Sequence, residues 1–161
     1  MLNVQFFVLG TTDMGRAIDF WTRALGYVVS AGGAEARWTE LVPAGGHGAA
    51  LALQYSETPV QEHPRNHIDL SVADAAEQAA EADRLVSLGA ERVAWDLYPA
   101  DPDFVVLADP DGNRFCVVDL SHVQPGGIAA APLGEPDRRG GSAGTQQRGA
   151  PGGDHSVPDH V

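Results

Sequence analysis

The residues best suited to chemistry are a histidine and an aspartate two positions apart, His67 and Asp69, in segment 66–72. Imidazole can carry a proton near neutral pH, and a carboxylate beside it can orient the ring or act as a second acid or base. Successive side chains of a strand point to opposite faces, so these two residues share one face with Ser71. The other face is aliphatic. The pattern therefore predicts a strand whose polar face meets a ligand and whose aliphatic face meets the core.

The elements that would position this strand occur in the same order in two parts of the chain. The first part predicts a strand over 3–8, a helix that begins at Thr12 or Asp13 and ends at Gly26, and strands over 27–30, 36–42 and 49–55. The second predicts a strand over 67–72, a helix between Asp74 and Gly89, and strands over 90–95, 104–108 and 114–120. This internal repeat predicts an α+β fold of two βαβββ modules, at about 2–56 and 66–121.

The alternation within the strands predicts which side chains face a ligand. In the first strand, Val4, Phe6 and Val8 are expected to face the core, and Asn3, Gln5 and Phe7 the other side. In strand 49–55, Leu51 and Leu53 are expected inside, with Ala52 and Gln54 on the ligand side. In the last strand, Cys116 and Val118 share the ligand side.

Charge and composition limit the partners. The formal net charge of -12 argues against nucleic acid, whose affinity comes largely from Lys and Arg, and favours neutral or cationic ligands. One cysteine allows no internal disulfide and fits a reducing cytoplasm. The apolar start of the chain lacks the length and the flanks of a membrane span or signal peptide. A soluble cytoplasmic protein without a membrane partner is therefore expected.

Residues 123–161 differ in composition from the rest of the chain. They are rich in Gly, Pro, Ala, Gln and Arg and almost without large apolar side chains, so this segment predicts a disordered tail after a domain of about 1–122. His155 and His160 lie in this tail, and chance composition explains them better than a metal site does.

Four motifs resemble the vicinal oxygen chelate superfamily, the glyoxalase and bleomycin resistance group. They are Ala17-Ile-Asp-Phe-Trp-Thr-Arg-Ala-Leu-Gly26, His67-Ile-Asp-Leu70, Leu85-Val-Ser-Leu-Gly-Ala90 and Asp109-Pro-Asp-Gly-Asn-Arg-Phe-Cys-Val117. The resemblance implies a curved, mostly antiparallel sheet cup with helices outside, a small-molecule ligand and often a divalent metal, and no organic cofactor. It leaves open whether the cup forms within one chain or in a homodimer that exchanges modules. The ligand-binding residues it implies are Gln5, Phe7, Gln54, His67, Asp69, Cys116 and Val118.

Metal-dependent members of the superfamily place two ligands in each module. Counting along this chain puts Asn3, Ala52, His67 and Cys116 at those positions, and alanine cannot bind a metal. A register shifted by two residues offers Gln5 and Gln54 with His67 and Cys116, a mixture of amides and a thiol that suits no common catalytic metal. We therefore expect no intact conventional metal site, with His67, Gln5 and Cys116 as the ligands if a metal binds.

Two functions follow from this reading. The first is a module that binds a small aromatic or cationic molecule without chemistry, with Phe7, Trp38, Trp95 and Tyr98 as candidate aromatic contacts. The second is a metal-dependent lyase, isomerase or dioxygenase, in which His67 is ligand or base and Asp69 orients it or transfers a proton. An equal alternative is that His67 only donates a hydrogen bond to a neighbour such as Asp69 or Gln5. Cys116 fits a small buried apolar residue better than a reactive thiol.

Overall fold

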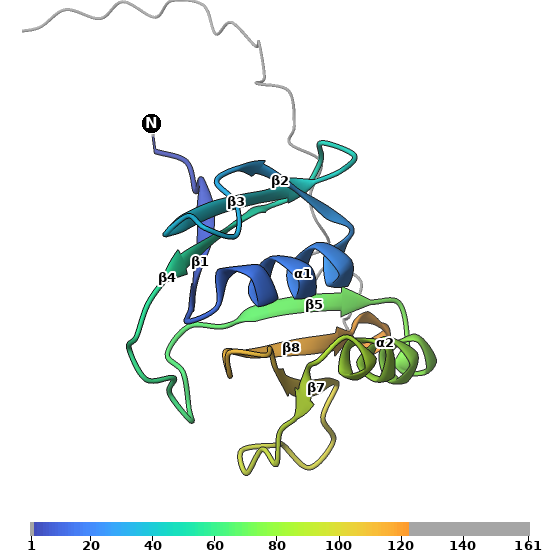
Figure 1. Cartoon of the computed structure of the whole chain (residues 1–161). Helices are drawn as coiled ribbons and strands as arrows, with labels where there is room; N and C mark the ends of the chain where they lie inside the picture. The colour runs from blue at the N-terminus through green and yellow to red at the C-terminus, as the bar shows by residue number, and fades with distance from the viewer. Residues whose placement is uncertain (1, 123–161) are drawn as a thin grey trace, which may run out of the picture. The chain divides into compact units, whose positions relative to one another are not determined.

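Two four-stranded sheets, each with one helix, form the part of the chain that the computed structural model describes, residues 2–122 (Figure 1). The first module contains β1 (Phe6–Thr11), α1 (Met14–Leu25), β2 (Tyr27–Ala31), β3 (Trp38–Pro43) and β4 (Ala50–Tyr55), with strand order β1-β4-β3-β2. The second contains β5 (Ile68–Val72), α2 (Ala75–Ser87), β6 (Glu91–Arg92), β7 (Phe104–Ala108) and β8 (Arg114–Asp119), with order β5-β8-β7-β6. A 3₁₀ turn, Leu120–His122, follows. The predicted α+β class and the two βαβββ modules are confirmed.

In each sheet the first strand pairs parallel with the fourth, and the remaining pairs are antiparallel. Each helix begins at an aspartate whose carboxylate accepts the amide N–H three residues on, Asp13 from Arg16 and Asp74 from Glu77. Helix α1 ends at Gly26, whose φ of 67° is the left-handed conformation that glycine adopts without strain. The two caps give a fixed point from which the modules can be aligned.

The first strand lies three residues later than its predicted start and reverses the predicted faces. It runs from Phe6 to Thr11, where Leu9 is 8% and Thr11 2% exposed. Phe7 packs against the core beside Leu9, whereas Val8 is 45% exposed on the opposite face. The prediction was wrong because two successive phenylalanines fit either alternation, and the buried positions beyond Val8 decide between them.

Strand β6 is also shorter than predicted. Only Glu91–Arg92 pair with β7, because the chain leaves the sheet edge after Val93 donates its amide to the carbonyl of Val106. The amide of Trp95 then donates a hydrogen bond to the carbonyl of Val93, which turns the chain away from the sheet. Trp95 therefore lies in a loop, and Pro99 and Pro102 farther along this loop cannot donate to a strand ladder.

One hydrophobic core joins the helix-facing sides of both sheets. Helix α1 covers the first sheet, and its Trp21 ring also packs against Phe115 of β8, with ring centroids 5.3 Å apart. Figure 1 shows α1 lying between the first sheet and β5. Both sheets pack their helix-facing side against this shared core. We call the other side of each sheet its open face, and the two open faces do not face each other within one chain. No helix among residues 2–122 is long and apolar enough to cross a membrane.

A buried carboxylate connects the modules. Asp109, 3% exposed in the turn before β8, accepts a hydrogen bond of 3.1 Å from Trp21 Nε1 in the first module. The same carboxylate accepts from the amides of Asp111 and Asn113 and from Asn113 Nδ2. Burial raises the pKa of Asp109, although these donors oppose the rise. Asn113 Nδ2 donates in addition to the carbonyl of Gly10, 2.9 Å away.

A second carboxylate of the same turn strengthens this connection. Asp111 accepts hydrogen bonds from Thr11 Oγ1 at 2.8 Å, from the amide and hydroxyl of Thr12, and from Arg16 Nη2 at 2.9 Å. Burial alone would raise the pKa of Asp111, but these donors outweigh it and hold that pKa below its ordinary value. The turn of the second module is therefore fixed against the end of β1.

Replacing the buried carboxylate tests this connection. We expect Asp109→Ala to lower the free energy of unfolding by about 3 kcal/mol, because the indole N–H of Trp21 and two amides lose their acceptor in the core. Asp19→Ala is the matched control, since it removes an exposed carboxylate paired with Arg23 and should change the value by less than about 0.5 kcal/mol. Urea unfolding of both variants measures the difference. Equal stability of the two variants would contradict the role given to Asp109.

Candidate functional site

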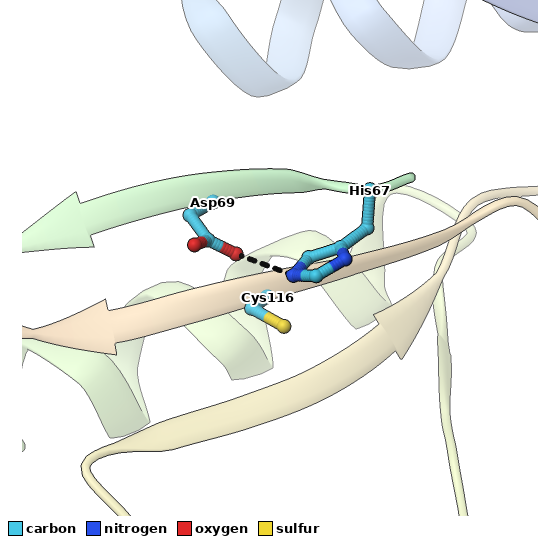
Figure 2. A group of neighbouring side chains, drawn as sticks. All are labelled: His67, Asp69 and Cys116. Carbon is cyan, nitrogen blue, oxygen red and sulfur yellow. Dashed lines mark ion pairs between the residues drawn. The ribbon is translucent and has the colours of Figure 1, made fainter. Parts of the chain in front are cut away.

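The open face of the second sheet carries three side chains with ligand or acid-base chemistry. His67 stands immediately before β5, Asp69 lies in β5, and Cys116 lies opposite Asp69 in the parallel strand β8. His67 Nε2 lies 3.2 Å from Asp69 Oδ1 (Figure 2). The donor atoms of the three residues lie within 4.8 Å of one another. We call these residues the polar cluster.

The local sequence explains this grouping. Ile68, Leu70 and Val72 pack against the core, as predicted, so the alternate side chains of β5 point to the open face. The side chains of His67 and Asp69 remain 45% and 60% exposed, whereas Cys116 is 8% exposed. Solvent or a ligand can therefore reach the imidazole and carboxylate directly and the sulfur only past them.

The thiol of Cys116 is held in its neutral form. Burial, together with the negative charge and hydrogen bonding of Asp69, raises the pKa of Cys116 to about 12. A thiol with such a pKa is almost entirely protonated at neutral pH, so it is a poor nucleophile. Within the polar cluster, Cys116 therefore acts as a small group that donates to the Asp69 carboxylate.

Two cavities meet beside the polar cluster. One of about 150 Å³ is lined by Pro64, His67, Trp95, Phe104, Val106, Arg114, Phe115 and Cys116. Another of about 290 Å³ lies along the segment that links the modules, between the end of β1 and the turn before β8. Pro64, His67 and Arg114 line both cavities. We call the two together the groove, which combines an aromatic wall at Trp95 and Phe104 with a polar end at His67.

The matching face of the first sheet is apolar. When the two modules are aligned on their helix caps, Asp13 and Asp74, Phe6 corresponds to His67 and Val8 corresponds to Asp69. The strand pairing then makes Ala52 the counterpart of Cys116. The count that equated Asn3 with His67 was therefore wrong by three residues, whereas the equation of Ala52 with Cys116 agrees with the pairing. The first module supplies no donor at these positions.

The other residues predicted for the site are divided between different places. Val118 follows Cys116 on the same face of β8, and Gln54 is exposed on the open face of the first sheet. Gln5 is exposed and precedes β1, so it is not a strand residue. Phe7 lies on the core side of β1 and not on the predicted open face, although it also lines the larger cavity of the groove. The binding roles of the remaining residues stay predictions.

The candidate aromatic contacts are divided in the same way. Trp95 lines the groove, whereas Trp38 lies on the open face of the first sheet, where its ring packs against Phe6 with centroids 6.0 Å apart. Tyr98 lies beside Phe104, with centroids 5.3 Å apart, and its hydroxyl accepts the amide of Val106. Tyr98 therefore packs against the Phe104 ring of the aromatic wall.

The donor set does not fit a conventional metal site. Among residues 2–122 the only cluster of three metal-binding side chains of the His, Cys, Asp and Glu types is the polar cluster, which comes from one module. The resemblance noted in the sequence implies ligands from both modules, but the first module offers Phe6 and Ala52 at the matching positions. The third donor of the cluster is a buried thiol, which would have to lose its proton to a metal. These residues could hold a borderline ion such as Zn²⁺ weakly, through three donors, but not in the expected set of four.

Sequence analysis did not single out Phe104 of the aromatic wall, nor the charged residue of the groove, Arg114. It lies two positions before Cys116 in β8 and therefore on the same open face. Its Nε is shielded from solvent and has no hydrogen-bond acceptor among residues 2–122. The alternation that selects Cys116 and Val118 also places Arg114 on the open face, but it does not show that the guanidinium lacks a partner.

Comparison with known proteins identifies the fold. The family model for the glyoxalase-like domain matches residues 6–118. No protein of curated function matches the chain by sequence.

Several solved structures are similar in fold. A glyoxalase-related enzyme from Fulvimarina pelagi is 19% identical with a TM-score of 0.56, covering 74% of this chain and 88% of that one. A glyoxalase/bleomycin resistance protein/dioxygenase family enzyme from Burkholderia phytofirmans PsJN is 14% identical with a TM-score of 0.54, covering 71% and 96%. The fosfomycin resistance protein FosX from Listeria monocytogenes, in a complex with Mn(II) and 1S,2S-dihydroxypropylphosphonic acid, is 16% identical with a TM-score of 0.55, covering 73% and 90%. At these identities the likeness shows the fold alone.

The protonated state of Cys116 can be tested by alkylation. At pH 8 we expect iodoacetamide to modify the folded protein at least about 100-fold more slowly than the same chain in urea, because a pKa of about 12 leaves almost no thiolate. Asp69→Asn should increase the folded-state rate several-fold, since it removes the charge that opposes ionisation. Asp83→Asn, which alters an exposed carboxylate paired with Arg92, is the control. A rate that levels off near pH 9 would contradict the assignment.

Proposed function

Because the chain belongs to the glyoxalase-like domain family, we propose that it binds a small organic molecule in the groove of the second sheet, without a catalytic metal. The supporting observation is the position of His67, which lines both cavities, has Nε2 3.2 Å from the Asp69 carboxylate, and lines the smaller cavity together with the aromatic wall. Small-molecule sites typically combine an apolar wall with a few convergent polar groups. In this proposal the ring of the ligand packs against Trp95 and Phe104, and His67 makes a hydrogen bond whose direction Asp69 fixes.

A metal-dependent enzyme is the second candidate. The observation that favours it is the polar cluster, whose imidazole, carboxylate and sulfur lie within 4.8 Å of one another. The similar structure of FosX contains Mn(II). A bound divalent ion would polarise an oxygen of the substrate, with His67 or Asp69 as the proton-transferring group. The apolar positions of the first module favour the metal-free proposal.

We further propose that the protein is a homodimer in which the first sheet of one copy covers the groove of the other. The open face of the first sheet exposes apolar side chains, Val8 at 45% and Trp38 at 37%, with Phe6 packed beside Trp38. A sheet normally buries an apolar face against another layer. A second copy would bury this face and enclose the groove. The expected location remains the cytoplasm, on the basis of the single cysteine.

Metal content distinguishes the two candidate functions. We expect the full chain without a purification tag to hold less than about 0.1 ion per chain by elemental mass spectrometry, after incubation with Zn²⁺, Ni²⁺, Mn²⁺ and Fe²⁺ and dialysis, because two of the expected four ligand positions are apolar. About one ion per chain that is lost in Asp69→Asn would instead support the enzyme. A double variant, His155→Ala and His160→Ala, controls for ions bound by the end of the chain.

Binding in the groove can be followed at its tryptophan. We expect benzamide at millimolar concentration to shift the indole N–H resonance of Trp95, while that of the buried Trp21, which donates to Asp109, stays unchanged. His67→Ala should weaken this binding at least about fivefold, the loss of one hydrogen bond. His47→Ala, an exposed histidine of a first-module turn, should not change it. A titration that moves no resonance of the groove would reject the proposed function.

The homodimer is tested by one substitution. Sedimentation velocity should give twice the mass of one chain for the natural sequence, and Val8→Asp should shift the protein to the monomer, because a charge would be buried in the apolar contact. Val86→Asp places the same charge on an exposed position of α2 and should leave the dimer intact. A natural chain that sediments as a monomer at all concentrations would overturn this arrangement.

A further inference from the structure

The guanidinium of Arg114 has no partner in the part of the chain that the structure describes. Its Nε is shielded from solvent and meets no acceptor there, and no carboxylate forms an ion pair with this side chain. Leaving a buried donor unpaired is unfavourable, and more so when the group is charged. Such groups in native proteins usually mark a missing water, ion or ligand.

The other arginines of residues 2–122 differ from Arg114. Four of them pair with carboxylates, Arg37 lies 4.3 Å over the ring of Tyr55, and Arg65 is exposed. The four ion-paired residues are Arg16, Arg23, Arg84 and Arg92. The chain carries 22 acidic residues against 10 basic ones, so carboxylates are abundant. That no carboxylate of residues 2–122 pairs with Arg114 indicates a guanidinium kept available.

The position of Arg114 connects it to the groove. Its side chain lines both cavities together with His67 and Pro64. Water can occupy this volume in the free protein and satisfy the N–H groups. Water cannot neutralise the positive charge, whereas an oxyanion does so and matches the planar fork of guanidinium donors with two parallel hydrogen bonds.

The geometry also orients a ligand. Asp69 would repel an anion, but it faces Cys116 and is already engaged with His67. Arg114 stands two residues before Cys116, roughly 7 Å along β8 at the rise of a strand. An anionic group can therefore contact Arg114 without approaching the Asp69 carboxylate, while the rest of the ligand extends along Trp95 and Phe104.

We infer that Arg114 is the anion-binding residue of the groove, and that the ligand is a small organic acid whose carboxylate or phosphonate contacts this guanidinium while its apolar body packs against Trp95 and Phe104. This inference rests on the proposed function and adds the class of the ligand. It replaces the neutral or cationic ligand expected from the net charge of -12.

The test compares two probes of nearly equal shape, benzoate and benzamide, which differ in charge. Both are titrated into the full chain, and the indole resonance of Trp95 reports binding. At low salt we expect benzoate to bind at least about tenfold more tightly than benzamide, as is typical of a charge-assisted pair. Added salt should reduce this preference. Phenylphosphonate as a third probe shows which oxyanion the groove prefers, and a preference for either anion over benzamide supports the inference.

Variants of Arg114 make the test specific. Arg114→Gln should reduce benzoate affinity about tenfold, to that of benzamide, without changing benzamide affinity, and Arg114→Lys should retain part of the preference. An unchanged indole resonance of Trp21, which lies in the core, verifies that each variant is folded. Arg92→Gln, which removes an exposed paired arginine, is the matched control.

The outcomes separate the two proposals. If neither benzoate nor phenylphosphonate binds the natural chain more tightly than benzamide, or if the preference persists in Arg114→Gln, the inference is overturned while the proposed binding function stands. If none of the three probes shifts Trp95, the proposed function fails and the ligand class fails with it.

Discussion

The hydrogen bond from the Trp21 indole to the buried Asp109 carboxylate is the contact on which the arrangement of the site depends. It joins the helix of the first module to the turn of the second, and Asn113 extends the connection to the carbonyl of Gly10. A carboxylate in a core is unfavourable by itself, but here four donors surround it. Strand β8 begins directly after this turn. The position of Arg114 and Cys116 is therefore fixed by a contact between modules.

That contact also decides which surfaces remain open. Because α1 packs against both sheets, the helix-facing sides share one core and the open faces are left to solvent. The two open faces then differ in chemistry although the modules share one scaffold. The second carries the polar cluster, and the first carries Phe6, Val8 and Ala52 at the matching positions. One module is therefore suited to binding and the other to covering an apolar surface, a division that a repeated fold permits.

The sequence predicted the features that depend on local pattern. The alternation of β5, both aspartate caps and the module repeat are confirmed, because each rests on residues close together in the chain. The first strand was placed wrongly because Phe6 and Phe7 satisfy either face, and only packing against Leu9 and Thr11 decides. Had the two caps been aligned, Phe6 rather than Asn3 would have matched His67. The isolation of Arg114 was not predictable, since the absence of a partner depends on every carboxylate's position in space.

The net charge of -12 favours a neutral or cationic ligand, whereas Arg114 in the groove favours an anionic one. The effect of Arg114 has the stronger physical basis. Exposed carboxylates spread over a surface are screened by salt within about 8–10 Å, so a charge of -12 acts mainly on solubility and on distant encounter. A half-buried guanidinium whose Nε is shielded from water acts at contact distance in a medium of lower effective dielectric, where each interaction is several-fold stronger. The acidic surface would slow the approach of an anion, whereas Arg114 would determine whether it stays. Affinity at this groove should therefore follow Arg114, which has no ion pair within residues 2–122, rather than the balance of the whole chain.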